Sequence, residues 1–400
     1  MLNSYLNNNG TNMKLKKLAV TLLGFIPLSA FAAGGLINEN ATTETKALYE
    51  NLANLGDKVL FGHEDSLAYG AKWWGYAEGG ALESDIKQVT GSFPAVFGAD
   101  MGGIGLGNEK NLDGVKFSDY AHYIKETFEM GGVNTVSWHM YSPIDEHHSW
   151  AKTSYVRELI PGGNHNDKLK TYLDSYIAFN ETLKVDVDGK EVWIPIIFRP
   201  WHEHNGDWFW WGKGHTTEAD YIALWKFTVD YLNEKGQNNL IYAFSPDRSR
   251  LDMSDFDNSY KYGYAGDAYV DIIGYDNYWD LGHPSNTQSV AEQQALFVEG
   301  LEKLTDLADK KGKVSALSEG GQEGVREDNF WTERFAAGIW ANEKTSRISY
   351  ALVWRNNNEE NGKKGHYYGA YPQEKNAANF VEFYNNKKSL FINNIPEMYK

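Results

Sequence analysis

The sequence contains no cysteine among its 400 residues. It therefore forms no disulfide bonds and offers no thiolate for a metal site or for nucleophilic catalysis. A lipid anchor on a cysteine is not expected for the same reason. Basic residues are also few, because 38 Lys and Arg stand against 54 Asp and Glu, which gives a net charge of −16 at pH 7. This balance disfavours nucleic acid and anionic membrane surfaces as partners.

Several catalytic signatures are missing as well. "LSEGG" (317–321) lacks the first glycine of G-x-S-x-G, and "GGIGLGNEK" (102–110) lacks the spacing of a phosphate-binding loop. "HEH" (202–204) is not H-E-x-x-H, and Pro200 disfavours a helical zinc site there. A metal ion held by His202, His204 and His139 stays a minor alternative, and we expect no metal and no cofactor.

Long apolar runs are confined to the N-terminus. Lys14, Lys16 and Lys17 precede "LAVTLLGFIPLSA" (18–30), and "AFA" (30–32) follows. This order is typical of a secretory signal peptide cleaved after Ala32, and its apolar part is too short for a permanent membrane span. Residues 1–12 are a candidate upstream extension, with Met13 as the natural start. We expect a secreted or periplasmic protein that does not insert into a membrane.

Residues 40–390 are predicted to form one catalytic domain, because no Pro/Ser/Thr-rich linker and no repeat interrupts them. Eight short apolar segments, typical of parallel strands buried on both faces, lie at 58–65, 93–100, 132–139, 192–203, 239–246, 270–278, 313–320 and 348–356. Amphipathic helical patterns lie at 118–132, 167–183, 218–236, 289–312 and 331–344. Eight such units predict an α/β fold of the (β/α)8 TIM-barrel type. A doubly wound open sheet is the less favoured alternative.

Polar and aromatic side chains gather where these strands end, and the active sites of such barrels lie at that end. Aromatic residues make up 14% of the chain, with 14 Trp and 25 Tyr. Their flat apolar faces with polar edges suit stacking on sugar rings. A tryptophan-rich core would give the same composition, but it does not explain why Trp, His and Tyr accompany the charges at strand ends.

Glu203, in "RPWHEHNGDWFWWG" (199–212), ends the fourth strand segment, and Glu319, in "LSEGG", ends the seventh. Glycosidic cleavage needs one protonated and one ionised carboxyl group on either side of the bond. The tryptophans that follow Glu203 are expected to raise its pKa and keep it protonated. Gly320 and Gly321 let a substrate approach Glu319 closely, which fits a nucleophile.

The two glutamate motifs, on the fourth and seventh of eight strands, resemble the catalytic signatures of glycoside hydrolase family 26, the β-mannanases. The resemblance continues through "SWH", "IIGYDNY" and "ALVWRN" over roughly residues 40–390. It implies a retaining double displacement, with Glu203 as acid/base and Glu319 as nucleophile. It further implies that His202 and Trp208 contact the sugar at the cleavage site, that Tyr275 hydrogen-bonds the nucleophile, and that His139 and Trp354 line the glycone side.

The predicted activity is therefore hydrolysis of β-1,4-mannosidic bonds in mannan, glucomannan or galactomannan by a monomeric enzyme. Two alternatives stay open: a relative acting on β-1,3-xylan or mixed-linkage β-glucan, and a catalytically silent carbohydrate-binding barrel. Endo and exo action, the latter with release of mannobiose, are both open. The loops at about 101–117 and 147–167 are long enough to narrow one end of a cleft.

Overall fold

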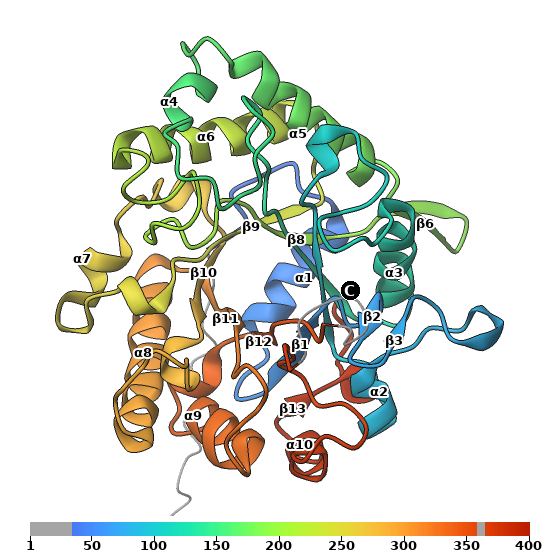
Figure 1. The fold of residues 1–400 in the computed structure, drawn as a ribbon. Coiled ribbons are helices and arrows are strands. Elements are labelled where there is room, and N and C mark those ends of the chain that lie inside the picture. The colour runs from blue at the N-terminus through green and yellow to red at the C-terminus, as the bar shows by residue number, and fades with distance from the viewer. Residues whose placement is uncertain (1–33, 358–364) are drawn as a thin grey trace, which may run out of the picture. The chain divides into compact units, whose positions relative to one another are not determined.

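The computed structural model describes residues 34–357 and 365–400, so the predicted signal peptide lies outside the described part of the chain. Eight parallel strands form a closed barrel, and Figure 1 shows them at the centre with helices around them. In chain order they are β1 (Val59–Glu64), β4 (Val96–Asp100), β5 (Val133–Ser137), β8 (Ile196–Arg199), β9 (Leu240–Phe244), β10 (Ile272–Asn277), β11 (Val314–Gly320) and β12 (Tyr350–Val353). The predicted (β/α)8 architecture is confirmed.

The helices lie between the strands and around them. They are α1 (Thr43–Ala53), α2 (Asp85–Thr90), α3 (Phe117–Glu129), α4 (Val156–Leu159), α5 (Asn166–Asn180), α6 (Glu218–Glu234), α7 (Phe256–Tyr260), α8 (Val290–Lys311), α9 (Ala337–Ile339) and α10 (Ala377–Tyr384). The long helix α8 starts with a capping box at Ser289 and Glu292 and ends at Gly312, whose φ of 65° suits glycine.

Short strands add to the edges of the fold. Two hairpins, β2 (Tyr69–Gly70) with β3 (Trp73–Trp74) and β6 (Lys184–Val187) with β7 (Lys190–Trp193), are antiparallel, and β13 (Ser389–Leu390) pairs with the start of β1. The predicted strand over 192–203 is therefore two elements, because Pro195 separates β7 from β8. The predicted helix over 331–344 is a π-helical turn, η7 (Phe330–Ala336), followed by the short α9.

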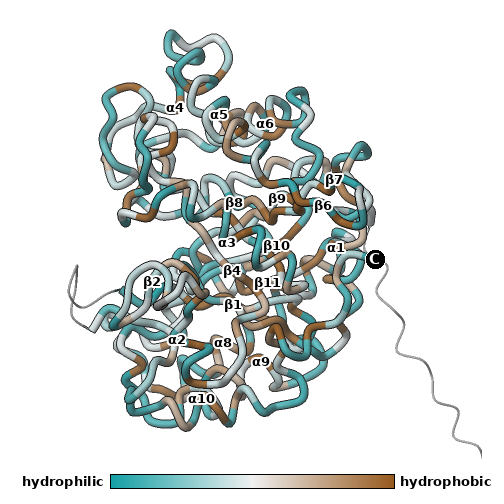
Figure 2. Tube along the Cα trace, turned by 90° about the vertical axis from the view of Figure 1, so that its right-hand side faces the viewer, coloured by the Kyte–Doolittle hydropathy of each residue, from teal (hydrophilic) through white to brown (hydrophobic). Residues whose placement is uncertain are grey.

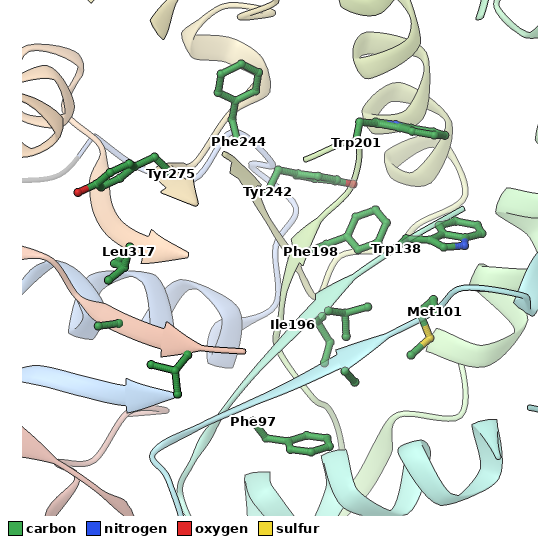
Figure 3. Packing of buried hydrophobic residues seen from close by; sticks show 14 of the residues in the cluster. Phe97, Met101, Trp138, Ile196, Phe198, Trp201, Tyr242, Phe244, Tyr275 and Leu317 are labelled. Carbon is green, nitrogen blue, oxygen red and sulfur yellow. The ribbon is translucent and has the colours of Figure 1, made fainter. Parts of the chain in front are cut away.

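Side chains alternate between the inside and the outside of the barrel, as the pleat of a strand requires. Leu60, Ile197 and their counterparts from the other strands form one cluster that fills the interior. Phe61 and Phe198, their neighbours in sequence, belong to a second cluster beneath the helices. Figure 3 shows part of this outer layer, and Figure 2 shows that hydrophobic stretches concentrate in the strands.

The two ends of the barrel differ in chemistry. Leu48, Tyr49 and Leu52 of α1 join the interior cluster and close the amino end of the strands. The carboxyl ends carry buried polar groups instead, including Asp100, Arg199 and Asp276. Within the described residues no helix is long and apolar enough to cross a membrane. A functional site is therefore expected at the polar, carboxyl end of the barrel.

Candidate active site

A cavity of about 760 Å³ opens at the carboxyl ends of the strands. Its lining residues include His139, Trp150, Glu203, Trp208, Asp247, Arg250, Tyr278, Glu319, Trp354, His366 and Tyr368. A second cavity of about 580 Å³ adjoins the first, and the two share His139, Trp150, Trp354 and His366. Five predicted site residues therefore meet in one place: Glu203, Glu319, His139, Trp208 and Trp354.

Glu203 lies in a tight turn directly after β8. Its φ is 53°, a left-handed conformation that costs a non-glycine residue about 1–3 kcal/mol, and its backbone N–H donates to the Ser245 carbonyl oxygen at 2.8 Å. Trp208 Nε1 donates to Glu203 Oε2 at 2.7 Å. The turn directs the carboxyl group into the cavity, and the indole N–H holds one of its oxygens.

Burial raises the pKa of Glu203 well above its usual value, and the negative charges of Asp247 and Glu319 raise it further. The hydrogen bond from Trp208 opposes these effects, since it favours the ionised form. Desolvation dominates because Glu203 is only 9% exposed. A raised pKa favours the protonated form of the carboxyl group, which is the form that a general acid requires.

Glu319, near the end of β11, is held by two donors. The Arg199 guanidinium contacts Glu319 Oε2 and also pairs with Asp276 at 2.7 Å, while the Tyr278 hydroxyl donates to Glu319 Oε1 at 2.6 Å. A register shift between β10 and β11 at Tyr275/Asp276 allows Ser318 to donate to Asp276 while the next residue, Glu319, reaches the cavity. Both donors stabilise a carboxylate in a fixed orientation.

One carboxylate oxygen of Glu203 and one of Glu319 lie within 4.8 Å of each other. Retaining glycosidases place the two carboxyl groups about 5–5.5 Å apart, and inverting enzymes place them about 6.5–9.5 Å apart to admit a water molecule. The short separation is closer to the spacing of the retaining enzymes. The geometry is that of a retaining pair.

Glu203, Asp276 and Glu319 are also spaced so that they could hold a cation. Arg199, which is 2% exposed, already contacts two of the three and supplies their positive charge. The alternative of three converging histidines is wrong for a geometric reason. His204 faces away from the cavity, and its Nε2 lies 2.7 Å from the Tyr262 carbonyl oxygen instead.

The partly buried His139 and the buried His202 are neighbours whose pKa values shift in opposite directions. Burial opposes a charge on His139, but Asp100, whose Oδ2 lies 2.7 Å from His139 Nδ1, raises its pKa overall. Burial, together with the charges of Arg199 and His139, lowers the pKa of His202 well below its usual value. His139 Nε2 and His202 Nε2 lie 3.3 Å apart, so that one of the two rings donates a hydrogen bond to the other.

Two site predictions need correction. His202 is 1% exposed and does not line either cavity, because the turn after β8 packs it behind His139 and against Phe209. Its predicted contact with the sugar does not fit this position. Tyr275 is fully buried and points outward from the barrel, as Figure 3 shows, so that its hydroxyl faces Gly300 of α8.

The hydrogen bond predicted for Tyr275 is made by Tyr278 instead. Side chains alternate along β10, so Ile273 and Tyr275 join the outer cluster and Asp276 faces inward toward Arg199. Tyr278 comes after the strand and is free of that alternation. Both tyrosines stand in "IIGYDNY", and the alternation along β10 argues against the first, because it places Tyr275 outside the barrel.

The tryptophans of the 199–212 segment divide into two groups. Trp201, Trp210 and Trp211 are at most 1% exposed, and each indole N–H finds an acceptor inside the protein. Trp208 alone among them lines the cavity. Tyr278, Trp150 and Asp247 also line the cavity, although the sequence pattern did not predict them as site residues. Asp247 follows β9, and polar residues after a strand end were the signal that could have indicated it.

The chain is similar to known proteins. The family model "Glycosyl hydrolase family 26" matches residues 37–360. A mannan endo-1,4-beta-mannosidase from Bifidobacterium adolescentis is 31% identical over 93% of this chain, which spans 38% of that relative's length. One from Bacillus subtilis strain 168 is 29% identical over 80% of this chain and 81% of the relative.

The chain is also similar to solved structures of mannanases. A GH26 beta-mannanase from Bacteroides ovatus is 36% identical and superposes with a TM-score of 0.80 over 90% of this chain and 98% of the other. A modular endo-beta-1,4-mannanase from Cellulomonas fimi is 31% identical, with a TM-score of 0.79 over 92% of this chain and 79% of the other. With a family model that matches most of its length and a barrel that carries the paired glutamates, the chain belongs to glycosyl hydrolase family 26.

Proposed function

We propose that this protein is a retaining β-mannanase that hydrolyses β-1,4-mannosidic bonds in mannan, glucomannan or galactomannan. The observation that carries the proposal is the pair of carboxyl groups within 4.8 Å in an aromatic cavity. One of them is a buried acid with a raised pKa, and the other is anchored by Arg199 and Tyr278. The activities of the mannanase relatives agree with this proposal.

The proposed reaction follows from the different surroundings of the Glu203 and Glu319 carboxyl groups. Glu319 attacks the anomeric carbon and forms a glycosyl–enzyme ester, while Glu203 transfers its proton to the departing glycosidic oxygen. Glu203, now ionised, takes a proton from a water molecule, whose oxygen attacks the same carbon and releases Glu319. Two displacements at one carbon retain the anomeric configuration. Trp208 contacts the sugar at the cleavage site, and His139 and Trp354 line the glycone side.

Glu319→Ala tests the nucleophile. The variant should lose mannan hydrolysis while it still binds mannohexaose, measured by reducing-sugar release and by isothermal titration calorimetry. A glycosyl–enzyme adduct on Glu319, trapped with a 2-fluoro mannobiosyl fluoride and located by mass spectrometry, would support the covalent step. Mannan hydrolysis that persists in the variant would remove Glu319 from the proposed role.

Two other functions are compared in the same assays. Reducing-sugar release on mannan, β-1,3-xylan and lichenan, measured side by side, separates the proposed substrate from the other glycans. A silent binding barrel would bind these glycans without turnover. The paired acids argue against that function, since binding alone needs neither a protonated nor an anchored carboxyl group.

We infer that the glycone end of the site is narrow. Leu112 and Asp113, from the loop over residues 101–116, line the second cavity, and Asp113 pairs there with Arg355. Trp150, from the segment over 147–167, lines both cavities. A narrow glycone end favours short products such as mannobiose from the start of the reaction. A product time course on mannohexaose and polymeric mannan tests this, and Asp113→Ala should shift the products toward longer oligosaccharides.

The proposed location is the periplasm or the outside of the cell, after cleavage of residues 1–32. The basic patch, the apolar run and the small residues at 30–32 support this assignment. The intact mass of the protein recovered from the periplasm or the medium should correspond to a chain that begins at Ala33. Light scattering of the same sample tests the proposed monomer.

A further inference from the structure

The Trp208 indole links the acid catalyst to a neighbouring loop. Its N–H holds Glu203 Oε2 at 2.7 Å, so the direction of the ring decides where that oxygen lies. The ring is only partly buried, and it packs edge-to-face on Phe209 with centroids 6.3 Å apart. A partly exposed ring that must hold a buried carboxyl group needs further support.

Part of that support comes from the backbone. A Cβ atom at Gly206 would lie 2.3 Å from Trp208 Cη2, so the ring rests against the chain at a place that only glycine allows. The glycine restricts the ring on one side but does not attract it. An attractive contact has to come from another element.

Arg250 supplies such a contact from η3 (Arg248–Arg250), the turn that follows β9. Its guanidinium carbon lies 5.3 Å from the centroid of the Trp208 ring, within the range of a cation–π interaction. Arg250 Nη2 is held in turn by Asp207 Oδ1 at 3.0 Å, and Asp207 precedes Trp208 in the chain. Arg250 and Asp207 are 49% and 61% exposed, and an exposed ion pair of this kind adds little to stability.

We propose that Arg250, held by Asp207, is a positioning residue for the acid catalyst: its guanidinium fixes the Trp208 ring and, through the indole N–H, the Glu203 carboxyl group. This inference rests on the proposed function, because it assigns Glu203 the role of proton donor. Arg250 also lines the catalytic cavity, so a direct contact with the aglycone is the rival explanation.

The two explanations differ in how the rate depends on the leaving group. Departure of 2,4-dinitrophenolate needs no proton, whereas phenolate and sugar alkoxide leave only with help from an acid. If Arg250 acts through Glu203, Arg250→Ala should lower kcat/KM for phenyl β-mannobioside about two- to fivefold, the worth of an exposed cation–π contact. The value for 2,4-dinitrophenyl β-mannobioside should stay unchanged. A contact with the aglycone would lower both values equally, since both rings occupy the same place.

The experiment measures kcat/KM for a series of aryl β-mannobiosides with wild type, Arg250→Ala, Arg250→Met and Arg250→Lys. The Ala and Met variants should show a steeper dependence of log kcat/KM on leaving-group pKa, and Lys, which keeps the cation, should restore the wild-type slope. Asp207→Asn should show a smaller change in the same direction. A parallel fall across the whole series, with no change of slope, would overturn the proposal.

Two controls separate this inference from its premises. Arg157→Ala removes another exposed arginine, which pairs with Asp220 at 3.2 Å and lines neither cavity, and it should leave the slope unchanged. Glu203→Ala, which removes the acid itself, should show the steepest dependence of log kcat/KM on leaving-group pKa. If wild type fails to cleave phenyl β-mannobioside, or Glu203→Ala lacks the steep slope, the proposed function is wrong. If both behave as expected and Arg250→Ala keeps the wild-type slope, only the positioning role is wrong.

Discussion

Tyr278→Phe is the sharpest test of the arrangement around Glu319, the proposed nucleophile. The substitution removes one hydroxyl, which donates to Glu319 Oε1 at 2.6 Å, and leaves the ring to pack edge-to-face on Tyr368. Arg199 still contacts the other oxygen, Oε2. The carboxylate is then held at one point instead of two, so it can rotate away from the line of attack.

The size of the effect follows from the charge on the acceptor. A hydrogen bond to a charged group contributes about 1.5–3 kcal/mol, which corresponds to roughly a 10- to 150-fold change in rate. The site is buried, since Glu319 is 5% exposed, so water does not easily replace the lost donor. We therefore expect kcat/KM for mannohexaose to fall by about one to two orders of magnitude. The thermal midpoint should fall as well, because a buried carboxylate loses one of its donors.

Tyr275→Phe is the matched control for this prediction. The Tyr275 hydroxyl lies 3.5 Å from Asn277 Nδ2 in the outer packing layer and does not reach Glu319. Its loss should lower the thermal midpoint slightly and leave kcat/KM unchanged. Initial rates and thermal unfolding of both variants decide the matter. A Tyr278→Phe rate within about twofold of wild type, or an equal kinetic loss in Tyr275→Phe, would refute the assignment.

Three further predictions concern protonation. Trp208→Phe removes a hydrogen bond that lowers the pKa of Glu203, so the alkaline limb of the kcat/KM profile should move to higher pH. Burial raises the pKa of Glu64 well above its unfolded value, so its contribution to stability is present at acid pH and lost as pH rises through the folded pKa. In Glu64→Gln that loss should disappear, which thermal midpoints at about pH 5 and 8 would show. Asp100→Asn should lower the pKa of His139, measured by NMR titration, because Asp100 is the group that raises it.

The fold was predictable because the sequence pattern of a buried strand occurs eight times. Each barrel strand reads as a short, nearly continuous apolar run, and the closed parallel sheet follows from their number. The first and last residues of a strand were less predictable where one apolar run covers two strands. Pro195 splits the 192–203 segment, so that Trp193 belongs to a surface hairpin and Ile196 begins a barrel strand. Apolar content alone does not distinguish the two.

The positions of the two glutamates at the barrel mouth were predictable and their hydrogen-bond donors were not, for a physical reason. Glu203 and Glu319 occupy strand ends, and the parallel barrel brings all strand ends to one mouth. The choice between Tyr275 and Tyr278 depends instead on which side of a strand a residue faces, and on a register shift at Tyr275/Asp276. A shift of one residue reverses every side chain beyond it, so proximity in sequence could not decide the partner.

The aromatic residues near Glu203 show how function and packing can be told apart by the hydrogen bonds that they make. A buried indole needs an acceptor for its N–H. Trp210 and Trp211 donate to the carbonyl oxygens of Met140 and His202, which fastens the loop to its surroundings. Trp208 donates to a titratable carboxyl group instead, so its geometry affects a proton that moves during the reaction. Trp208 is therefore the tryptophan of this loop whose replacement should change the chemistry, while replacement of Trp210 or Trp211 should mainly lower the stability.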